Sequence, residues 1–155
     1  MDELKYIQMS YPGQIATLAP VVKAFHDEVP ARYLRGVGFD PAGFCAFMAA
    51  TANSGFGAVF AASDEAGTPQ GFLYGVCYPD TFLGLNVCSE SHWYMMEAYR
   101  GSGLALLRMF EDWGRARGAR LITAGHFPFV AGAKMKAMYE RLGFLHFQEQ
   151  YAKEL

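Results

Sequence analysis

Residues 86–125 contain the pattern that most restricts how this chain can fold. A strand-like run at 86–97 leads into a loop with two glycines, RGSGLA at 100–105. An amphipathic helix is expected from about residue 103 to 116, and a second strand-like run follows at 119–127. Two strands joined through a helix pair in parallel with a right-handed crossover. The segment therefore predicts an α/β fold.

The remaining periodic patterns add elements on both sides of this unit. Period-two alternation predicts strands, and apolar residues three or four apart predict helices. We expect further strands at 4–9, 57–63, 72–79 and 144–155, and further helices at 14–30, 42–55 and 132–142. The predicted order is β-α-α-β-β-β-α-β-α-β. It describes a mixed, mostly antiparallel sheet flanked by helices, in a single domain spanning residues 1–155.

Composition and charge exclude several classes of protein. The three cysteines, Cys45, Cys77 and Cys88, lack paired or zinc-like spacing, so free thiols and no metal site are expected. A net charge of −2 argues against a broad nucleic-acid surface. No apolar run approaches the roughly 20 residues of a membrane span, and the N-terminus lacks the apolar core of a signal peptide. We expect a cytoplasmic protein without membrane contact.

The loop at 100–105 is a candidate anion site. Its glycines allow a ligand to approach the backbone closely. The first amides of the following helix have no partner within the helix, and the helix dipole adds positive potential there. The loop lacks the lysine of a Walker A motif and the third glycine of the dinucleotide-binding fingerprint. A plain tight turn is the alternative that the loop alone leaves open.

Two motifs together carry a resemblance to a known family. Arg100, Gly103 and Ala105 match R/Q-x-x-G-x-G/A, and about 35 residues later the run YERLGF at 139–144 follows. In this order the pair resembles the GNAT superfamily of acyl-CoA-dependent N-acyltransferases. The resemblance implies a gap between the fourth and fifth strands. One departure is Gly132, where family members often carry an asparagine that contacts the cofactor. Its loss is expected to weaken or rearrange cofactor binding.

The resemblance also implies where acetyl-CoA (coenzyme A) binds. The amides of the loop and of the first helical turn would hold the diphosphate, and the backbone of the fourth strand would hydrogen-bond the pantetheine arm. One strand amide would polarise the thioester carbonyl. The cofactor-binding residues implied are Tyr94, Met95, Met96, Arg100, Gly101, Ser102, Gly103, Leu104 and Ala105.

The same resemblance implies an N-acetyltransferase acting on a primary amine of a small molecule or protein, by direct attack in a ternary complex. Tyr139 matches the family's proton donor to the departing thiolate. Period-two geometry predicts that Glu90, His92 and Tyr94 share one face, which makes Glu90 and His92 the candidate bases. His126 is a third candidate. A structural packing role for Tyr139 and a solvated position for Glu90 are the alternatives.

The acceptor is expected between the first two helices and the segment after the third strand. Aromatic residues are frequent there, and Arg32 and Arg35 offer contacts to an anionic acceptor. The aromatic candidates are Phe25, Tyr33, Phe39, Tyr78 and Phe82. The alternative function is a non-catalytic acyl-CoA-binding module of the same fold. A homodimer is left open, because family members often dimerise.

Overall fold

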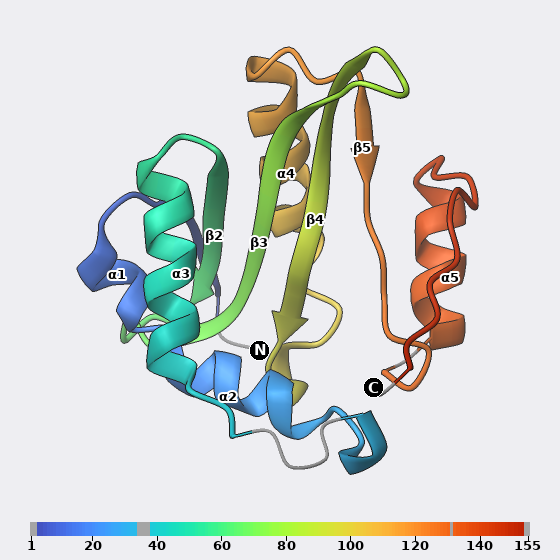
Figure 1. The fold of residues 1–155 in the computed structure, drawn as a ribbon. Helices are drawn as coiled ribbons and strands as arrows, with labels where there is room; N and C mark the ends of the chain where they lie inside the picture. Colours follow the sequence, from blue (N-terminus) through green and yellow to red (C-terminus); the bar gives the residue numbers. More distant parts are fainter. Residues whose placement is uncertain (1–2, 34–37, 131, 154–155) are drawn as a thin grey trace.

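The structure is a computed structural model that describes residues 3–33, 38–130 and 132–153 (Figure 1). It contains β1 (Lys5–Met9), α1 (Pro12–Ala16), α2 (Ala19–Asp27), η1 (Ala31–Tyr33), α3 (Pro41–Asn53), β2 (Gly57–Ser63), β3 (Pro69–Asp80), β4 (Leu85–Met95), η2 (Glu97–Tyr99), α4 (Leu104–Ala116), β5 (Leu121–Thr123) and α5 (Gly132–Arg141).

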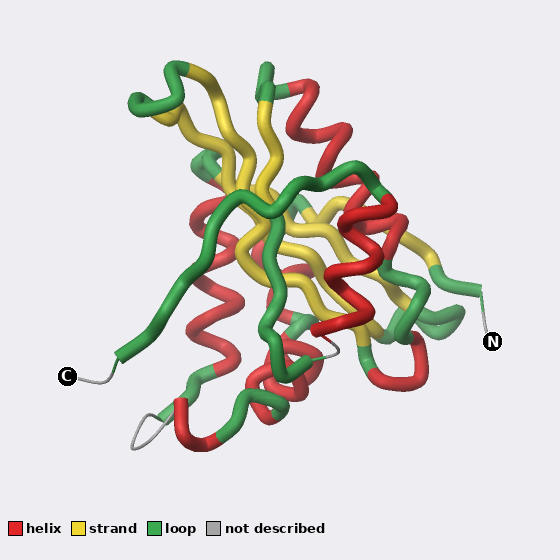
Figure 2. The backbone as a smooth tube through the Cα atoms, turned by 90° about the vertical axis from the view of Figure 1, so that its right-hand side faces the viewer, coloured by secondary structure: helices red, strands yellow, loops and turns green. Residues whose placement is uncertain are grey.

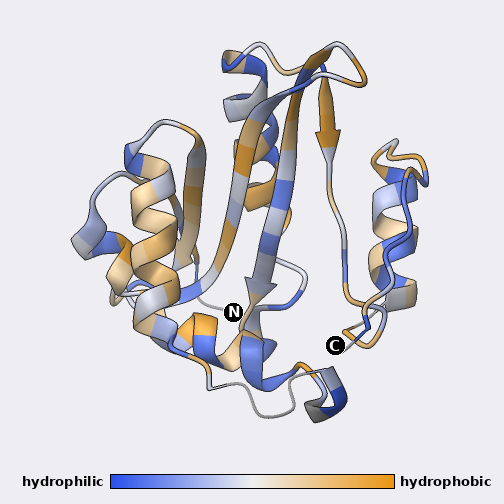
Figure 3. Ribbon diagram, in the orientation of Figure 1, coloured by the Kyte–Doolittle hydropathy of each residue, from blue (hydrophilic) through white to orange (hydrophobic). Residues whose placement is uncertain are grey.

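One five-stranded sheet in the order β1-β2-β3-β4-β5 organises the described chain. The first four strands pair antiparallel, and β5 pairs in parallel with β4. Helices α1, α2 and α3 cover one face and α4 covers the other (Figure 1). Figure 3 shows the apolar character along α3, which is buried through Cys45, Met48 and Ala49. The predicted mixed α/β fold with a parallel β4–β5 pair is confirmed.

Helix α4 follows directly from its sequence. Its apolar face is formed by Leu106, Phe110 and Trp113 at helical spacing, and the first two are fully buried against the sheet while Trp113 packs beside them. On the outer side Arg115 pairs with Glu111 at 3.4 Å and with Asp112 at 2.6 Å. Apolar burial holds the helix, since exposed ion pairs of this kind add only a few tenths of a kcal/mol each.

Three expected elements differ from the structure. The single helix at 14–30 is two helices, because Pro20 in the first turn of α2 has no amide hydrogen to continue the helical bonding of α1. The strand at 119–127 is paired only over β5. The last strand at 144–155 is wrong for residues 144–153, which Figure 2 draws as a loop.

The C-terminal segment shows why alternation alone does not make a strand. Leu145 is 89% exposed and Tyr151 is 91% exposed. The recorded backbone bond from this segment runs to the end of α5, from the Phe144 amide to the Tyr139 carbonyl at 3.0 Å. A strand needs the hydrogen-bonding edge of a neighbour, and within the described chain these residues do not join the sheet.

An irregularity in the β3–β4 pair sets the direction of the side chains in the middle of β4. Tyr74 lies opposite His92, and Gly75 lies opposite Glu90, so Ser91 is an extra residue on β4. Such a bulge locally reverses the alternation of faces. Counting by twos along β4 therefore does not give residues on the same face when the count crosses Ser91.

The β4–β5 pair ends well before β4 does. Pairing is confined to Val87 with Leu121, Cys88 with Ile122 and Ser89 with Thr123. Beyond Ser89, β4 continues to Met95 without β5 beside it, and Figure 1 shows the two strands separating there. This divergence leaves one backbone edge of β4 without a strand partner on the β5 side.

We expect the substitution Gly75→Ala to lower the free energy of unfolding by about 2 kcal/mol, because extra atoms in a packed core force side chains out of position. A Cβ at Gly75 would lie against the Phe110 ring and 2.9 Å from the Ser89 carbonyl oxygen. Chemical denaturation monitored by circular dichroism measures this change.

The matched control is Gly13→Ala. Gly13 lies in α1, and a Cβ there would meet no heavy atom within 4 Å. Alanine favours a helix over glycine by roughly 0.5–1 kcal/mol, so this variant should be as stable as the parent or more stable. Equal stability of the Gly75 and Gly13 variants would contradict the packing described for β3 and α4.

Candidate active site

The loop between β4 and α4 presents unpaired backbone amides. Gly101 has φ +101°, a left-handed conformation that glycine tolerates, and a Cβ there would meet nothing within 4 Å. The amide of Ser102 donates to the Tyr99 carbonyl at 3.1 Å. Among the described residues no backbone acceptor is recorded for the amides of Gly101, Gly103, Leu104 and Ala105. These four donors gather at the positive end of α4, as an anion site requires.

Gly103 leaves little room for a side chain. It is the N-cap of α4 and is buried. A Cβ there would lie 2.9 Å from Nε1 of Trp93 and 3.0 Å from Cγ of Met95. The close approach of this turn to β4 places the free amides of the loop directly beside the unpaired edge of that strand.

The Arg100 side chain binds protein groups. Its guanidinium forms an ion pair with Glu28 at the end of α2 and lies 5.8 Å above the Tyr94 ring centroid. The Tyr94 hydroxyl donates to the same Glu28 carboxylate at 2.6 Å. Burial and this hydrogen bond raise the pKa of Tyr94 to about 12. Arg100 therefore connects the loop to α2, while the neighbouring amides remain available.

The directions of the backbone amides at the end of β4 decide which of them is free to bind the pantetheine arm. The Met96 amide donates to the Gln70 carbonyl at 2.8 Å. Hydrogen bonds to one neighbour alternate along an antiparallel strand, and Tyr94 lies opposite Phe72, so the Tyr94 amide faces β3 as well. Of the three predicted backbone donors, Tyr94 and Met96 are thus engaged with β3. The amide of Met95 points to the side that β5 has left.

Glu90 and Tyr139 meet across the divergence of β4 and β5 at a single residue. The Gly125 amide donates to Oε2 of Glu90 at 3.1 Å. The Tyr139 hydroxyl donates to the Gly125 carbonyl oxygen at 2.9 Å. Gly125 follows β5 by two residues, and its main-chain amide and carbonyl groups hydrogen-bond to both candidate catalytic side chains. Sequence reasoning named Glu90 and Tyr139 but missed Gly125.

The environment of these two groups changes their acidity. Burial raises the pKa of Glu90 to about 7, although the hydrogen bond from the Gly125 amide acts in the opposite direction. Burial, followed by the negative charge of Glu90, raises the pKa of Tyr139 above its ordinary value of 10. A carboxylate that titrates near neutral pH suits a general base, and the tyrosine keeps its proton.

His92 lies on the other face of the sheet. Its ring packs 5.0 Å from that of Phe44 and 6.4 Å from that of Tyr74, both measured between centroids. The expectation that Glu90, His92 and Tyr94 share one face is therefore wrong for Glu90, because of the bulge at Ser91. Tyr94 stays with His92 on the face covered by α2 and α3.

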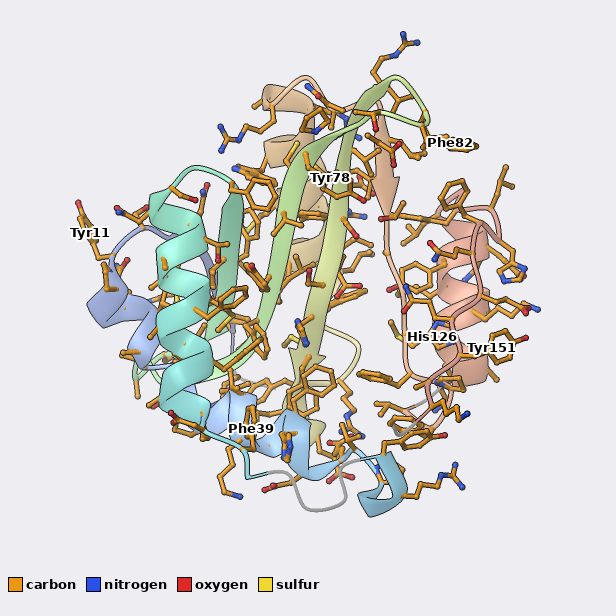
Figure 4. All side chains as sticks on the ribbon, in the orientation of Figure 1. Tyr11, Phe39, Tyr78, Phe82, His126 and Tyr151 are labelled. Carbon is orange, nitrogen blue, oxygen red and sulfur yellow. The ribbon has the colours of Figure 1, made fainter. Side chains whose placement is uncertain are left out.

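The two candidate histidines, His92 and His126, lie in different environments. Burial lowers the pKa of His92, and its Nδ1 has no hydrogen-bond partner among the described residues. A neutral, enclosed imidazole with no recorded partner fits packing better than proton transfer. His126 is exposed, and its ring centroid lies 6.0 Å from that of Tyr139, beside α5 in Figure 4. Burial lowers its pKa also.

Two residues that sequence reasoning missed support the site through contacts with the loop before α4. Glu28 holds Arg100 across 72 positions of the chain, and Trp93 packs against Gly103. Neither carries a local signal, because a single glutamate after a helix and a tryptophan in a strand are both ordinary. Gly125 offers only a weak signal, as a glycine near the end of a strand.

Other features of the described residues do not form a competing site. The surface depressions found lie away from β4 and β5, one on α5 at Lys134, Ala137, Glu140 and Arg141, the other at Glu3, Lys5 and Glu65. Within residues 3–33, 38–130 and 132–153, no group of three metal-ligating side chains comes together. No helix in these ranges has the length and apolar character to cross a membrane.

Comparison with solved structures shows the same fold at low sequence identity. A ribosomal-protein-alanine N-acetyltransferase from Brucella melitensis biovar Abortus 2308 superposes with a TM-score of 0.71 at 13% identity, with 99% of each chain covered. A glucosamine-6-phosphate N-acetyltransferase from Arabidopsis thaliana gives 0.72 at 11% identity, again with 99% of each chain covered. An aminoglycoside N-acetyltransferase in complex with CoA gives 0.73 at 16% identity, covering 100% of this chain and 96% of that chain.

Sequence comparisons identify a family for this chain but no individual curated relative. A search of curated proteins found no significant match. The model of the acetyltransferase (GNAT) family matches residues 18–144, which include the α4 loop, the divergence of β4 and β5, and Tyr139. The predicted resemblance is confirmed, and the chain belongs to the acetyltransferase (GNAT) family.

Proposed function

We propose that this protein is an N-acetyltransferase that transfers the acetyl group of acetyl-CoA to a primary amine. The proposal is carried by one arrangement: free amides at the start of α4 lie beside the edge of β4 that β5 has left. Glu90 and Tyr139 converge on Gly125 at the same place. Membership of the acetyltransferase family supports the reaction class.

The residues present fit acetyl-CoA as the acyl donor. The diphosphate matches the donors at Gly101, Gly103, Leu104 and Ala105. The pantetheine amides match an unpaired strand edge, which recognises extended chains through backbone hydrogen bonds. Acetyl-CoA supplies the activated acetyl thioester, and the protein supplies position and polar contacts.

The reaction needs one base, one carbonyl contact and one donor to sulfur. Glu90 takes a proton from the protonated amine, which then attacks the thioester carbon directly. The Met95 amide donates to the carbonyl oxygen, where negative charge develops. A C–N bond forms and the C–S bond breaks. No covalent intermediate with the protein is required, since both reactants are held together.

Tyr139 acts on the departing sulfur. A thiol has an ordinary pKa of about 8.5, well below that of a tyrosine whose pKa is raised. Tyr139 therefore stabilises the thiolate mainly as a hydrogen-bond donor, and the thiolate becomes the free thiol by taking the second proton, which the attacking nitrogen releases as the amide forms. In the structure this hydroxyl donates to Gly125, so it must turn from that carbonyl toward the sulfur.

A thiol-release assay with acetyl-CoA and a panel of primary amines tests the function. We expect free CoA to appear in proportion to the acetylated amine detected by mass spectrometry. Calorimetric binding of acetyl-CoA without thiol release for any amine would instead support the alternative, a non-catalytic acyl-CoA-binding module. A longer acyl-CoA run in parallel measures the acyl-chain preference.

The substitution Tyr139→Phe should lower kcat by about 100- to 1,000-fold, the range lost when one donor to a developing charge is removed. The dissociation constant for acetyl-CoA should change less than three-fold, roughly within 0.6 kcal/mol, because the ring still packs against Trp93 and Phe144. Steady-state kinetics and calorimetry measure the two quantities separately.

Tyr74→Phe is the matched control for this variant. Tyr74 also loses one hydrogen bond, from its hydroxyl to Oγ1 of Thr51 at 3.0 Å, on the opposite face of the sheet. Both variants should lose about 1 kcal/mol of stability, while only Tyr139→Phe loses turnover. Unchanged kcat for Tyr139→Phe from pH 6 to 9 would rule out its donor role.

A further inference from the structure

Five aromatic rings form a continuous row from the end of β4 to the surface. We call Tyr94, Phe25, Phe127, Phe129 and Tyr33 the aromatic row. Centroid distances are 5.0 Å from Tyr94 to Phe25, 6.0 Å from Phe25 to Phe127, 5.1 Å from Phe127 to Phe129 and 5.2 Å from Phe129 to Tyr33. These are ordinary separations for interacting rings.

The row is assembled from four separate parts of the chain. Phe25 belongs to α2, Tyr33 to η1 and Tyr94 to β4, and Phe127 and Phe129 follow β5. Tyr94 is buried and Phe25 packs on the core, whereas Phe127 is 43% exposed and Tyr33 is 50% exposed. The row therefore begins in the core and ends with apolar surface facing solvent, as a binding surface does.

The row reaches the proposed reacting centre at Phe127, whereas the Tyr94 ring lies on the face of the sheet opposite Glu90. Tyr94 precedes Met95, whose amide faces the thioester position. Phe127 lies two residues after Gly125, which is hydrogen-bonded to both Glu90 and Tyr139. An amine presented to Glu90 from this side would place the rest of its molecule along the rings.

The charged side chains beside the aromatic row limit the charge that the acceptor can have. Arg32 lies 5.0 Å over the Tyr33 ring, and Arg100 lies 5.8 Å over the Tyr94 ring. Arg100 is neutralised by Glu28, while no acidic partner of Arg32 is recorded within the described residues. Arg35, the other predicted contact, lies outside the described residues. A polycationic acceptor would meet Arg32 as a like charge, which disfavours its binding.

We propose that the acceptor is a primary amine that carries an aromatic ring, and that its ring stacks on the aromatic row at Phe127. This inference rests on the proposed N-acetyltransferase function and specifies its substrate class. Phe127 supplies an exposed ring near the reacting centre, and stacking fixes the distance from the ring to the amine.

Two size-matched amines test the role of the ring. With acetyl-CoA saturating, kcat/KM is measured for 2-phenylethylamine, for 2-cyclohexylethylamine and for glucosamine as a polar amine. Stacking favours an aromatic over a saturated ring by about three- to ten-fold beyond apolar burial. We expect that ratio between the first two amines, and on the order of 50-fold between 2-phenylethylamine and glucosamine once the apolar contact is included.

Phe127→Leu tests the position of the ring. This variant keeps an apolar side chain, so it should erase the preference for the phenyl over the cyclohexyl amine and leave the acetyl-CoA dissociation constant unchanged. Phe82→Leu is the matched control. Phe82 is 94% exposed in the β3–β4 turn, at the other end of the molecule from the acceptor side (Figure 4). Its substitution should leave the preference intact.

The outcomes separate this inference from the function on which it rests. Turnover of glucosamine at the rate of 2-phenylethylamine, or a phenyl preference that survives in Phe127→Leu, overturns the aromatic acceptor while acetyl transfer stands. Turnover of none of the amines, with acetyl-CoA bound, overturns the proposed function and this inference with it. Loss of the preference only in Phe127→Leu supports both.

Discussion

Replacing Gly103 by glutamate should abolish acetyl-CoA binding, with an affinity at least about 100-fold weaker, or roughly 2.7 kcal/mol. The new carboxylate would bring a negative charge to the turn that carries the free amides of Gly101, Leu104 and Ala105, where the diphosphate is expected. Like charges in one small site repel strongly because little solvent separates them. Isothermal titration calorimetry with acetyl-CoA measures the change.

Gly103→Ala separates the charge from the added volume. Its Cβ meets Trp93 and Met95 in the same way, so it reports the steric cost alone. Ala105→Glu, with Ala105→Gln as its neutral partner, keeps the Gly103 turn intact, and a carboxylate in the first turn favours the helix. Both glutamate variants should melt as folded proteins and bind poorly. Affinity equal to the parent in folded Ala105→Glu would refute the loop assignment.

Glu90→Gln should lower kcat/KM by about 100- to 1,000-fold, since general-base catalysis contributes on the order of 10²–10⁴-fold. The rate of the parent enzyme should rise with pH and level off above about pH 7, where Glu90 becomes ionised. The variant should lose that ionisation from its profile. Initial rates from pH 5.5 to 9 with one amine show both effects. A parallel profile in the variant would contradict the base role.

The raised pKa of Glu90 also predicts that the free energy of unfolding changes with pH. The pKa of Glu90 in the folded protein, about 7, lies above its ordinary value of 4.5, so the folded protein binds the proton more tightly. Its contribution to stability is therefore complete below about pH 4.5 and is lost as the pH rises through 7. Glu90→Gln should be about 2 kcal/mol more stable than the parent at pH 8 and nearly equal at pH 5.

Glu65→Gln is the control for that comparison. Glu65 is exposed in the turn between β2 and β3, away from the catalytic groups. Its substitution should leave the stability difference between pH 5 and pH 8 unchanged. Denaturant titrations at the two pH values give the comparison. A Glu90→Gln variant that is less stable than the parent at pH 8 would contradict the raised pKa of this half-buried carboxylate.

Local chemistry explains which parts of the fold were predictable. The turn at Gly101–Gly103 and the apolar stripe of α4 depend on neighbouring residues, and both occur as expected. Gly143, with φ +85°, follows the end of α5, where glycine tolerates the left-handed conformation. The final strand failed because alternation describes only a preference, whereas a strand requires an edge on another segment.

Long-range contacts explain what the sequence left undecided in the site. The bulge at Ser91 arises in the pairing of β3 with β4, and it moved Glu90 to the opposite face from His92. The ion pair of Arg100 with Glu28 joins residues far apart in the chain. No periodicity contains such information, because it concerns one segment at a time.

The amino-acid sequence by itself determined the family, the order of most elements, the glycine turn proposed to bind an anion and the two candidate side chains Glu90 and Tyr139. Only the tertiary structure decided that these two meet at Gly125, that Met95 keeps its amide free, and that rings from four segments form one row. The physical reason is that a turn or a helix is specified by residues close together in the chain. The direction of a strand amide and the hydrogen-bond partner of a half-buried carboxylate depend on which distant segment packs beside them.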